Sequence, residues 1–151
     1  MTGNARAMTK ATLPYALPDK LESGLAETLA YWRGLIRGKA SSMPYWDDVK
    51  LPEMASRAER VMLVAAFEKP ERFRFEIVGS GIASRYGEEL QGRFADEVDI
   101  RSPLEFFRSQ ASVTVEGRAP TLYAGGGYAR LLLPLWGDGH ISMLLCAFSD
   151  I

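Results

Sequence analysis

The chain has 151 residues, of which 47% are hydrophobic and 25% charged, a length and composition typical of one globular domain with its own core. Its formal net charge is −1, and its basic residues are spread along the chain, which excludes the basic arm or patch that binds nucleic acid or anionic membranes. The single cysteine, Cys146, excludes an internal disulfide framework and suits a reducing compartment.

Residues 1–18 are polar and interrupted by prolines, so we expect a flexible lead-in before one domain over 19–151. The lead-in lacks the continuous apolar core of a secretory signal. No stretch reaches the roughly 20 apolar residues that a membrane span needs. We therefore expect a cytoplasmic protein that does not contact a membrane.

A helix is predicted over 19–37, with Asp19 as its N-cap, Glu22 completing a capping box, and Gly38 ending it. Large apolar residues recur along it at helical spacing and form one stripe: Leu25, Leu29, Trp32 and Ile36. Leaving this stripe in water would be costly. We expect it to pack on the sheet, or against the same helix of a second copy in a homodimer.

Two strands follow, over 60–67 and 72–78, joined by a tight turn. The first is a short apolar run. The second alternates, with charged residues on one face and an apolar set on the other: Phe73, Phe75 and Ile77. This period of two predicts an antiparallel hairpin whose apolar set faces the core.

The sequence Gly79-Ser80-Gly81 after this hairpin resembles the start of a dinucleotide-binding loop. Such a loop follows a parallel strand that is apolar on both faces, whereas this strand carries charges, and Ser84 stands where the third glycine belongs. We interpret the glycines as allowing a tight turn from strand to helix.

Ile82 and Tyr86 predict a short helical segment, and Ser102 and Pro103 predict the start of a longer helix with Leu104 and Phe107 facing inward. Three strands fill the last third, divided by glycine-rich turns at 125–127 and 137–139. The predicted fold class is α+β, a five-stranded antiparallel sheet with short helices on one face and the helix 19–37 in addition.

The final two strands are apolar at nearly every position, so both faces of the sheet should be covered. We expect the helix 19–37 to cover the outer face, against Leu144, Cys146 and Phe148.

This order of elements resembles that of PAS domains. The residues that carry the resemblance are, in chain order, Tyr31-Trp32, Val78-Gly79, Tyr86-Gly87, Glu89-Leu90-x-Gly92-Arg93 and Leu133-Pro134-Leu135. The first and last of these resemble a compact bacterial variety of the domain. The resemblance covers about residues 25–150.

The resemblance implies a sensory or interaction module without catalysis, which binds a small apolar or amphipathic ligand or a protein partner and signals through dimer contacts. It also implies a cavity between the sheet and the short helices. The residues expected to line that cavity are Phe73, Phe75, Ile77, Ile82, Tyr86, Leu104, Phe107 and Arg130.

We expect no flavin, haem or metal. Cys146 lies in the last strand rather than in the short helices where flavin photosensors carry their cysteine, and the helix after Pro103 has no histidine for haem. One cysteine and one histidine, His140, do not make a metal site. Cys146 is interpreted as a buried hydrophobe and His140 as an exposed hairpin residue.

A rival hypothesis is a small α+β enzyme or lipid carrier with a cone-shaped cavity. It requires polar or titratable groups that converge in one pocket. The candidates are Arg85, Tyr86, Arg130 and His140.

Overall fold

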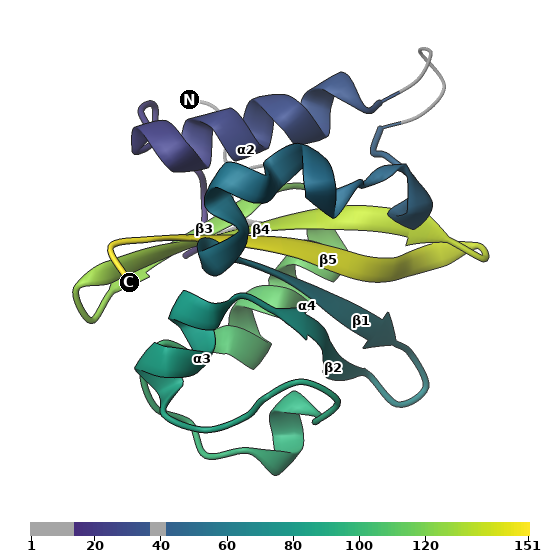
Figure 1. Cartoon of the computed structure of the whole chain (residues 1–151). Coiled ribbons are helices and arrows are strands. Elements are labelled where there is room, and N and C mark those ends of the chain that lie inside the picture. The colour runs from purple at the N-terminus through teal and green to yellow at the C-terminus, as the bar shows by residue number, and fades with distance from the viewer. Residues whose placement is uncertain (1–13, 37–41) are drawn as a thin grey trace.

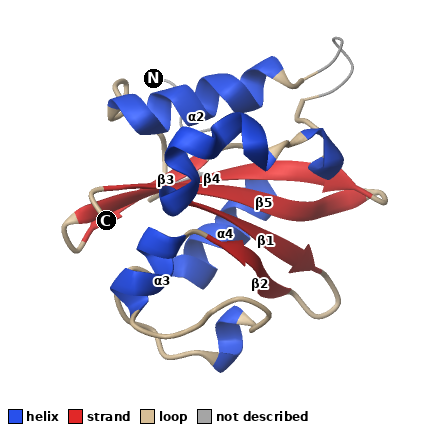
Figure 2. Ribbon diagram, in the orientation of Figure 1, coloured by secondary structure: helices blue, strands red, loops and turns tan. Residues whose placement is uncertain are grey.

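The computed structural model describes residues 14–36 and 42–151. It confirms the α+β class: the sheet has five antiparallel strands in the order β2-β1-β5-β4-β3, with helices against both faces (Figures 1 and 2). The strands are β1 (Val61–Phe67), β2 (Arg72–Val78), β3 (Thr121–Gly125), β4 (Tyr128–Gly137) and β5 (His140–Ser149). The α-helices are α2 (Ser23–Gly34), α3 (Ser80–Tyr86) and α4 (Phe107–Gly117), and the 3₁₀ helices are η1 (Trp46–Asp48), η2 (Leu51–Arg60) and η3 (Ala95–Glu97).

The strand pairing assigns side chains to the two faces, because paired residues of an antiparallel ladder point the same way. Phe75 contacts the ring of Phe107 in α4, and it pairs with Val64, which pairs with Leu144. These residues define the inner face, toward α3 and α4. The outer face lies toward α2 and η2 (Figure 1).

Both faces of β4 and β5 are covered, as their composition predicts, but the predicted assignment of the outer face is wrong. Phe148 pairs with Arg130, whose guanidinium contacts Gln110 of α4, so Phe148, Cys146 and Leu144 lie on the inner face. The outer positions of β5 are the intervening residues Met143, Leu145 and Ala147. Because both faces of β5 are buried, its sequence lacks the alternation of apolar and polar residues that would have shown which residues face inward.

A bulge in the first hairpin moves Ile77 to the outer face. Phe75 pairs with Val64 and Ile77 with Leu63, so Glu76 is an extra residue that changes the phase of β2. Ile77 is 42% exposed and lies beside Leu51 and Met54 of the outer cover. The predicted position of Ile77 in the inner cavity is therefore wrong.

Helix α2 is shorter than the predicted helix. It begins at Ser23 with Glu22 as its cap, whose Oε1 accepts a hydrogen bond from the Leu25 N–H at 3.0 Å. It ends at Gly34, and Gly38 lies outside the described residues. The predicted cap, Asp19, precedes the helix because Glu22 reaches the N–H groups of the first turn itself.

The apolar stripe of α2 packs on the sheet of its own chain. Leu25, Leu29 and Trp32 are buried, while Ile36 is partly buried against the same core. The indole N–H of Trp32 donates to the carbonyl of Pro134 in β4 at 2.9 Å. Of the two covers predicted for the stripe, the structure shows the intramolecular one.

The two glycines of the Gly-Ser-Gly sequence allow α3 to approach the end of η2. A Cβ on Gly79 would stand 2.5 Å from the carbonyl oxygen of Glu59, and one on Gly81 would stand 2.9 Å from the same atom. Both positions therefore serve a backbone contact between two helical elements, where only glycine fits.

Helix α4 begins at Phe107, later than predicted from Ser102 and Pro103. The intervening segment is a loop in which the carbonyls of Pro103 and Glu105 accept hydrogen bonds from a buried side chain of β4, as described below. None of the helices in the described part of the chain is long and apolar enough to cross a membrane.

Candidate functional site

Arg130 is the largest fully buried side chain of the described chain, and it stands on the inner face near the start of β4. Arg130 is 0% exposed, so its guanidinium has no contact with solvent. Such a cation must be compensated by the protein itself.

The guanidinium of Arg130 is held by neutral acceptors. Its Nε donates to Gln110 Oε1 at 2.8 Å. Its Nη1 donates to the carbonyl of Pro103 and its Nη2 to the carbonyl of Glu105, both at 2.8 Å. A longer contact of 3.4 Å joins Nη1 to the hydroxyl of Tyr128. Burial lowers the pKa of Arg130 below its usual value.

Aromatic rings flank the same guanidinium. Its Cζ lies 4.8 Å from the centroid of Tyr123 in β3 and 5.3 Å from that of Phe107 in α4. These distances are those of cation–π contacts. No carboxylate of the described residues forms an ion pair with Arg130.

A buried polar network fixes the amide of Gln110 toward Arg130. Gln110 Nε2 donates to Thr121 Oγ1 at 3.0 Å and to the backbone carbonyl of Arg130 at 3.1 Å. Thr114 and Thr121 share a hydrogen bond of 2.6 Å. With its nitrogen engaged in this way, Gln110 presents its oxygen to the guanidinium.

The carboxylate of Glu105 is connected to Arg130 through the hydroxyl group of Tyr128. The hydroxyl of Tyr128 donates to Glu105 Oε1 at 2.7 Å, and it also lies near Arg130. Burial and, second, this bond to a carboxylate raise the pKa of Tyr128, so the phenol stays neutral.

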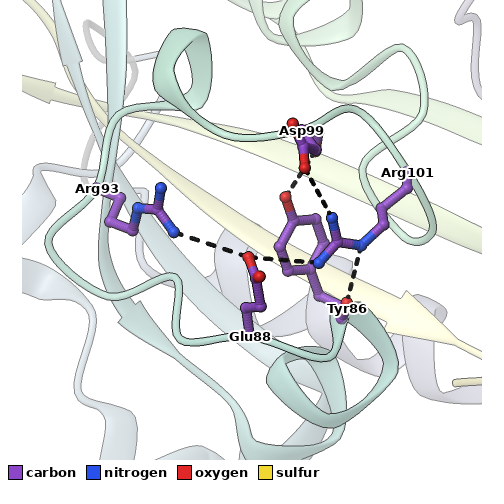
Figure 3. Close-up of polar contacts among 5 residues, drawn as sticks. All are labelled: Tyr86, Glu88, Arg93, Asp99 and Arg101. Carbon is purple, nitrogen blue, oxygen red and sulfur yellow. Dashed lines mark hydrogen bonds and ion pairs between the residues drawn. The ribbon is translucent and has the colours of Figure 1, made fainter.

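The loop between α3 and α4 is fastened on its other side by the cluster in Figure 3. The hydroxyl of Tyr86 donates to the carbonyl of Asp99 at 2.7 Å, and Arg101 Nε donates to the carbonyl of Tyr86 at 3.1 Å. The guanidinium of Arg101 also lies over the Tyr86 ring, with Cζ 4.0 Å from its centroid, and pairs with Glu88 at 3.4 Å. Arg93 reaches the same carboxylate at 3.9 Å.

Arg85 of α3 joins three separate segments. Its Nε donates to Ser102 Oγ at 2.9 Å, its Nη2 to the carbonyl of Gly126 at 2.8 Å, and its Nη1 to the carbonyl of Asp150 at 2.9 Å. Its Cζ lies 5.1 Å from the ring centroid of Tyr128. Arg85, over the ring, and Arg130, near the hydroxyl, therefore both contact this one tyrosine.

A groove of about 300 Å³ opens on the surface beside this centre. It is lined by Pro14, Tyr15, Phe106, Leu122, Tyr123 and Ala124. Phe106 is 62% exposed and has a left-handed backbone with φ of 59°. Its ring lies 5.8 Å from that of Tyr123, which also contacts Arg130. One aromatic ring thus stands between the groove and the buried cation.

The other residues predicted to line a cavity belong to the buried core between the sheet and the helices, except Ile77. The rings of Phe73 and Phe75 contact that of Phe107 at 6.3 and 5.6 Å. The buried apolar members of this core are Phe73, Phe75, Ile82, Tyr86, Leu104 and Phe107. They belong to one packed cluster, and Arg130 contacts this cluster through the ring of Phe107.

The four residues on which the enzyme hypothesis depends do not converge. Arg85 and Arg130 meet at Tyr128, but Tyr86 turns its hydroxyl to the carbonyl of Asp99. His140 lies at the β4–β5 turn, with Nδ1 3.3 Å from the carbonyl of Asp138.

Cys146 is buried on the inner face, where burial raises the pKa of its thiol. The described residues contain no group of three or more histidine, cysteine, aspartate or glutamate side chains that could hold a metal ion.

Sequence reasoning found Arg130 but missed its partners Gln110, Glu105, Tyr123 and Tyr128. The one available signal was the arginine itself, a charge at an apolar strand position that requires acceptors nearby. Those acceptors come from α4, the preceding loop and the start of β4, and no local pattern indicates which distant segments meet.

Comparison of the chain with known proteins gave no match to a family model, to a curated protein or to a solved structure.

Proposed function

We propose that the protein is a cytoplasmic PAS-like sensory or interaction module that binds a small ligand or a protein partner and responds by changing its association. The proposal is supported by the element order, with the helical segment 80–117 inserted between β2 and β3 and lying on the inner face. The lone cysteine, buried as a thiol, suits a reducing compartment.

The observation that carries the proposal is the Arg130 centre. The buried cation of Arg130 ties β4 to the loop before α4 and to α4 itself, through Glu105 and Gln110. In this proposal the loop before α4 has two positions, which define two states of the domain. A ligand that binds one state more tightly shifts the equilibrium toward that state, by an amount set by the difference between its two affinities. Tyr123 and Tyr128 extend the same connection to the β3–β4 hairpin.

Association of two copies is part of the proposal, as the PAS resemblance implies. The stripe formed by Leu25, Leu29 and Trp32 is buried within one chain, so a dimer contact uses another surface. An unidentified signalling protein is the second partner, as the PAS resemblance implies.

Native mass spectrometry of the protein purified from its own host tests the proposal. We expect a small molecule retained on the protein, a dimer, or a co-purified partner. Repeating the measurement after denaturing extraction and refolding is the control, because a bound ligand is then lost while the chain mass stays unchanged. A bare monomer under all conditions, without partner, contradicts the proposed function.

A further inference from the structure

We propose that the pocket between α2 and η2 binds a small zwitterion with an apolar body, the chemistry of an apolar α-amino acid. The two helices lie over the outer face of the sheet and are joined by an ion pair (Figure 1). The pocket between them has a volume of about 310 Å³. The proposal rests on the sensory function proposed above and assigns the chemical class of the ligand.

Arg57 of η2 lines this pocket and uses only part of its guanidinium within the chain. Its Nη1 donates to Glu27 Oε1 of α2 at 2.9 Å. Among the described residues, neither Nε, which is buried, nor Nη2 has an acceptor. Nε and Nη2 present two parallel N–H groups along one edge, the arrangement that pairs with both oxygens of a carboxylate. The side chain as a whole is 21% exposed, so a ligand in the pocket can contact it.

A second guanidinium and an apolar surface adjoin Arg57. Arg60 lines the same pocket three residues further along η2, which places it on the same side, since a 3₁₀ helix has three residues per turn. Arg60 is exposed and forms no ion pair within 14–36 and 42–151. The sheet contributes Val61 and Ala147, which pair across β1 and β5. The pocket therefore offers two cations beside an apolar floor.

Carboxylates line the pocket as well, and they disfavour a simple anion. Glu27 is neutralised by Arg57. Glu22, on the α2 wall, caps the helix through Oε1, while its Oε2 has only a contact of 3.5 Å with the hydroxyl of Ser23. Glu59 of η2 forms no ion pair in the part of the chain that the structure describes. Charges of both signs therefore remain for a ligand, which suits a molecule with one carboxylate and one ammonium group.

The three parts of the pocket assign the three parts of the ligand. The carboxylate pairs with Arg57 and Arg60 on the η2 wall, and the ammonium group pairs with Glu22 on the α2 wall. The apolar body lies on Val61 and Ala147. Such a ligand bridges the two helices that cover the outer face, so its binding favours the state in which both are docked on the sheet.

The test titrates three molecules of nearly equal shape into the whole chain while amide chemical shifts are followed by NMR. L-Leucine carries both charges, 4-methylpentanoate lacks the ammonium group, and 3-methylbutylamine lacks the carboxylate. We expect saturable shifts at residues 22–28 and 56–61 with L-leucine. Each analogue should bind more weakly by roughly tenfold or more, because one charge-assisted pair is lost.

Two substitutions separate the two charged walls. Arg57→Met should weaken binding of L-leucine and 4-methylpentanoate by roughly tenfold and leave that of 3-methylbutylamine unchanged. Glu22→Gln, which keeps an oxygen for the helix cap, should weaken binding of L-leucine and 3-methylbutylamine and leave that of 4-methylpentanoate unchanged. Arg33→Met, at an exposed arginine of α2 outside the pocket, is the matched control and should behave as wild type. A general loss of folding would weaken all three probes alike and so differs from the expected pattern.

Binding of either analogue to wild type as tightly as L-leucine overturns the assignment of a zwitterion. Absence of saturable shifts with L-leucine, or shifts confined to other residues, overturns the pocket as its site. The proposed function is judged separately, because a ligand, a dimer or a partner retained in native mass spectrometry supports it whichever of these outcomes is found.

Discussion

At the scale of single residues, Arg130 shows how a buried charge organises a fold. Its cation is costly to bury, and its hydrogen bonds to Gln110, Pro103 and Glu105 offset that cost only while all of them persist. The same bonds hold the loop before α4 against the sheet, since the carbonyls of Pro103 and Glu105 accept from a side chain of β4.

Truncating the core phenylalanine tests the packing of the inner face. Phe75→Ala removes a fully buried ring that contacts Phe107 and should lower the free energy of unfolding by about 3–5 kcal/mol. Urea unfolding followed by circular dichroism measures it. Phe106→Ala is the matched control, because an exposed ring contributes about 0.5 kcal/mol or less. Equal losses in both variants would contradict the described core.

The thiol of Cys146 should be protected in the folded state. It is fully buried, and burial raises its pKa, so the native protein should not react with a thiol reagent such as DTNB until it unfolds. A raised pKa in the folded state contributes stability that is present below the unfolded value of about 8.5 and is lost as pH rises above it. The unfolding free energy should therefore fall more steeply above that pH in wild type than in Cys146→Ala. Rapid labelling of the native protein would refute this.

At the scale of elements, the contact between η2 and α3 depends on two glycines. The backbone of Gly79 and Gly81 lies against the carbonyls at the end of η2, so the outer cover and the inner helices touch at the edge of the sheet. This contact accounts for the Gly-Ser-Gly sequence without a nucleotide.

Gly79→Ala should destabilise the protein by about 1–3 kcal/mol, because the new methyl group forces two backbones apart. Gly34→Ala is the control, since a Cβ at the end of α2 meets nothing within 4 Å. Removing a helical glycine should stabilise the protein by up to about 1 kcal/mol. The two alanine variants should thus move the thermal midpoint in opposite directions, and a neutral Gly79→Ala would show that the approach of η2 is not tight.

The periodicity of apolar residues predicted where the strands lie, but not on which face of the sheet every side chain stands. The alternation of β2 placed Phe73 and Phe75 inward correctly, whereas the extra residue Glu76 reversed Ile77. A bulge is set by pairing with a distant strand, so local alternation carries no sign of it. In β5 both faces are buried, so the sequence does not indicate which residues face inward. The prediction that Leu144 lies on the outer face is therefore wrong.

At the scale of the whole molecule, the sheet is enclosed by one chain. Helices α3 and α4 lie on the inner face and α2 with η2 on the outer face (Figure 1). The need for two covers could be predicted from the apolar excess of β4 and β5. The Arg130 centre could not, because it joins β3, β4, α4 and the loop before α4, which are brought together only by the complete fold.

The enclosed stripe of α2 determines what charged substitutions do there. Leu29 and Trp32 are buried against the sheet, and the Trp32 indole donates to Pro134. Leu29→Asp with Trp32→Asp places two unpaired carboxylates in this core, which costs several kcal/mol each. We expect loss of the native circular dichroism and aggregation, rather than a folded monomer. Ala26→Asp with Ala30→Asp changes the exposed face of the same helix and should keep the fold. A folded, monomeric Leu29→Asp/Trp32→Asp protein in sedimentation would mean that the stripe instead covers a second copy.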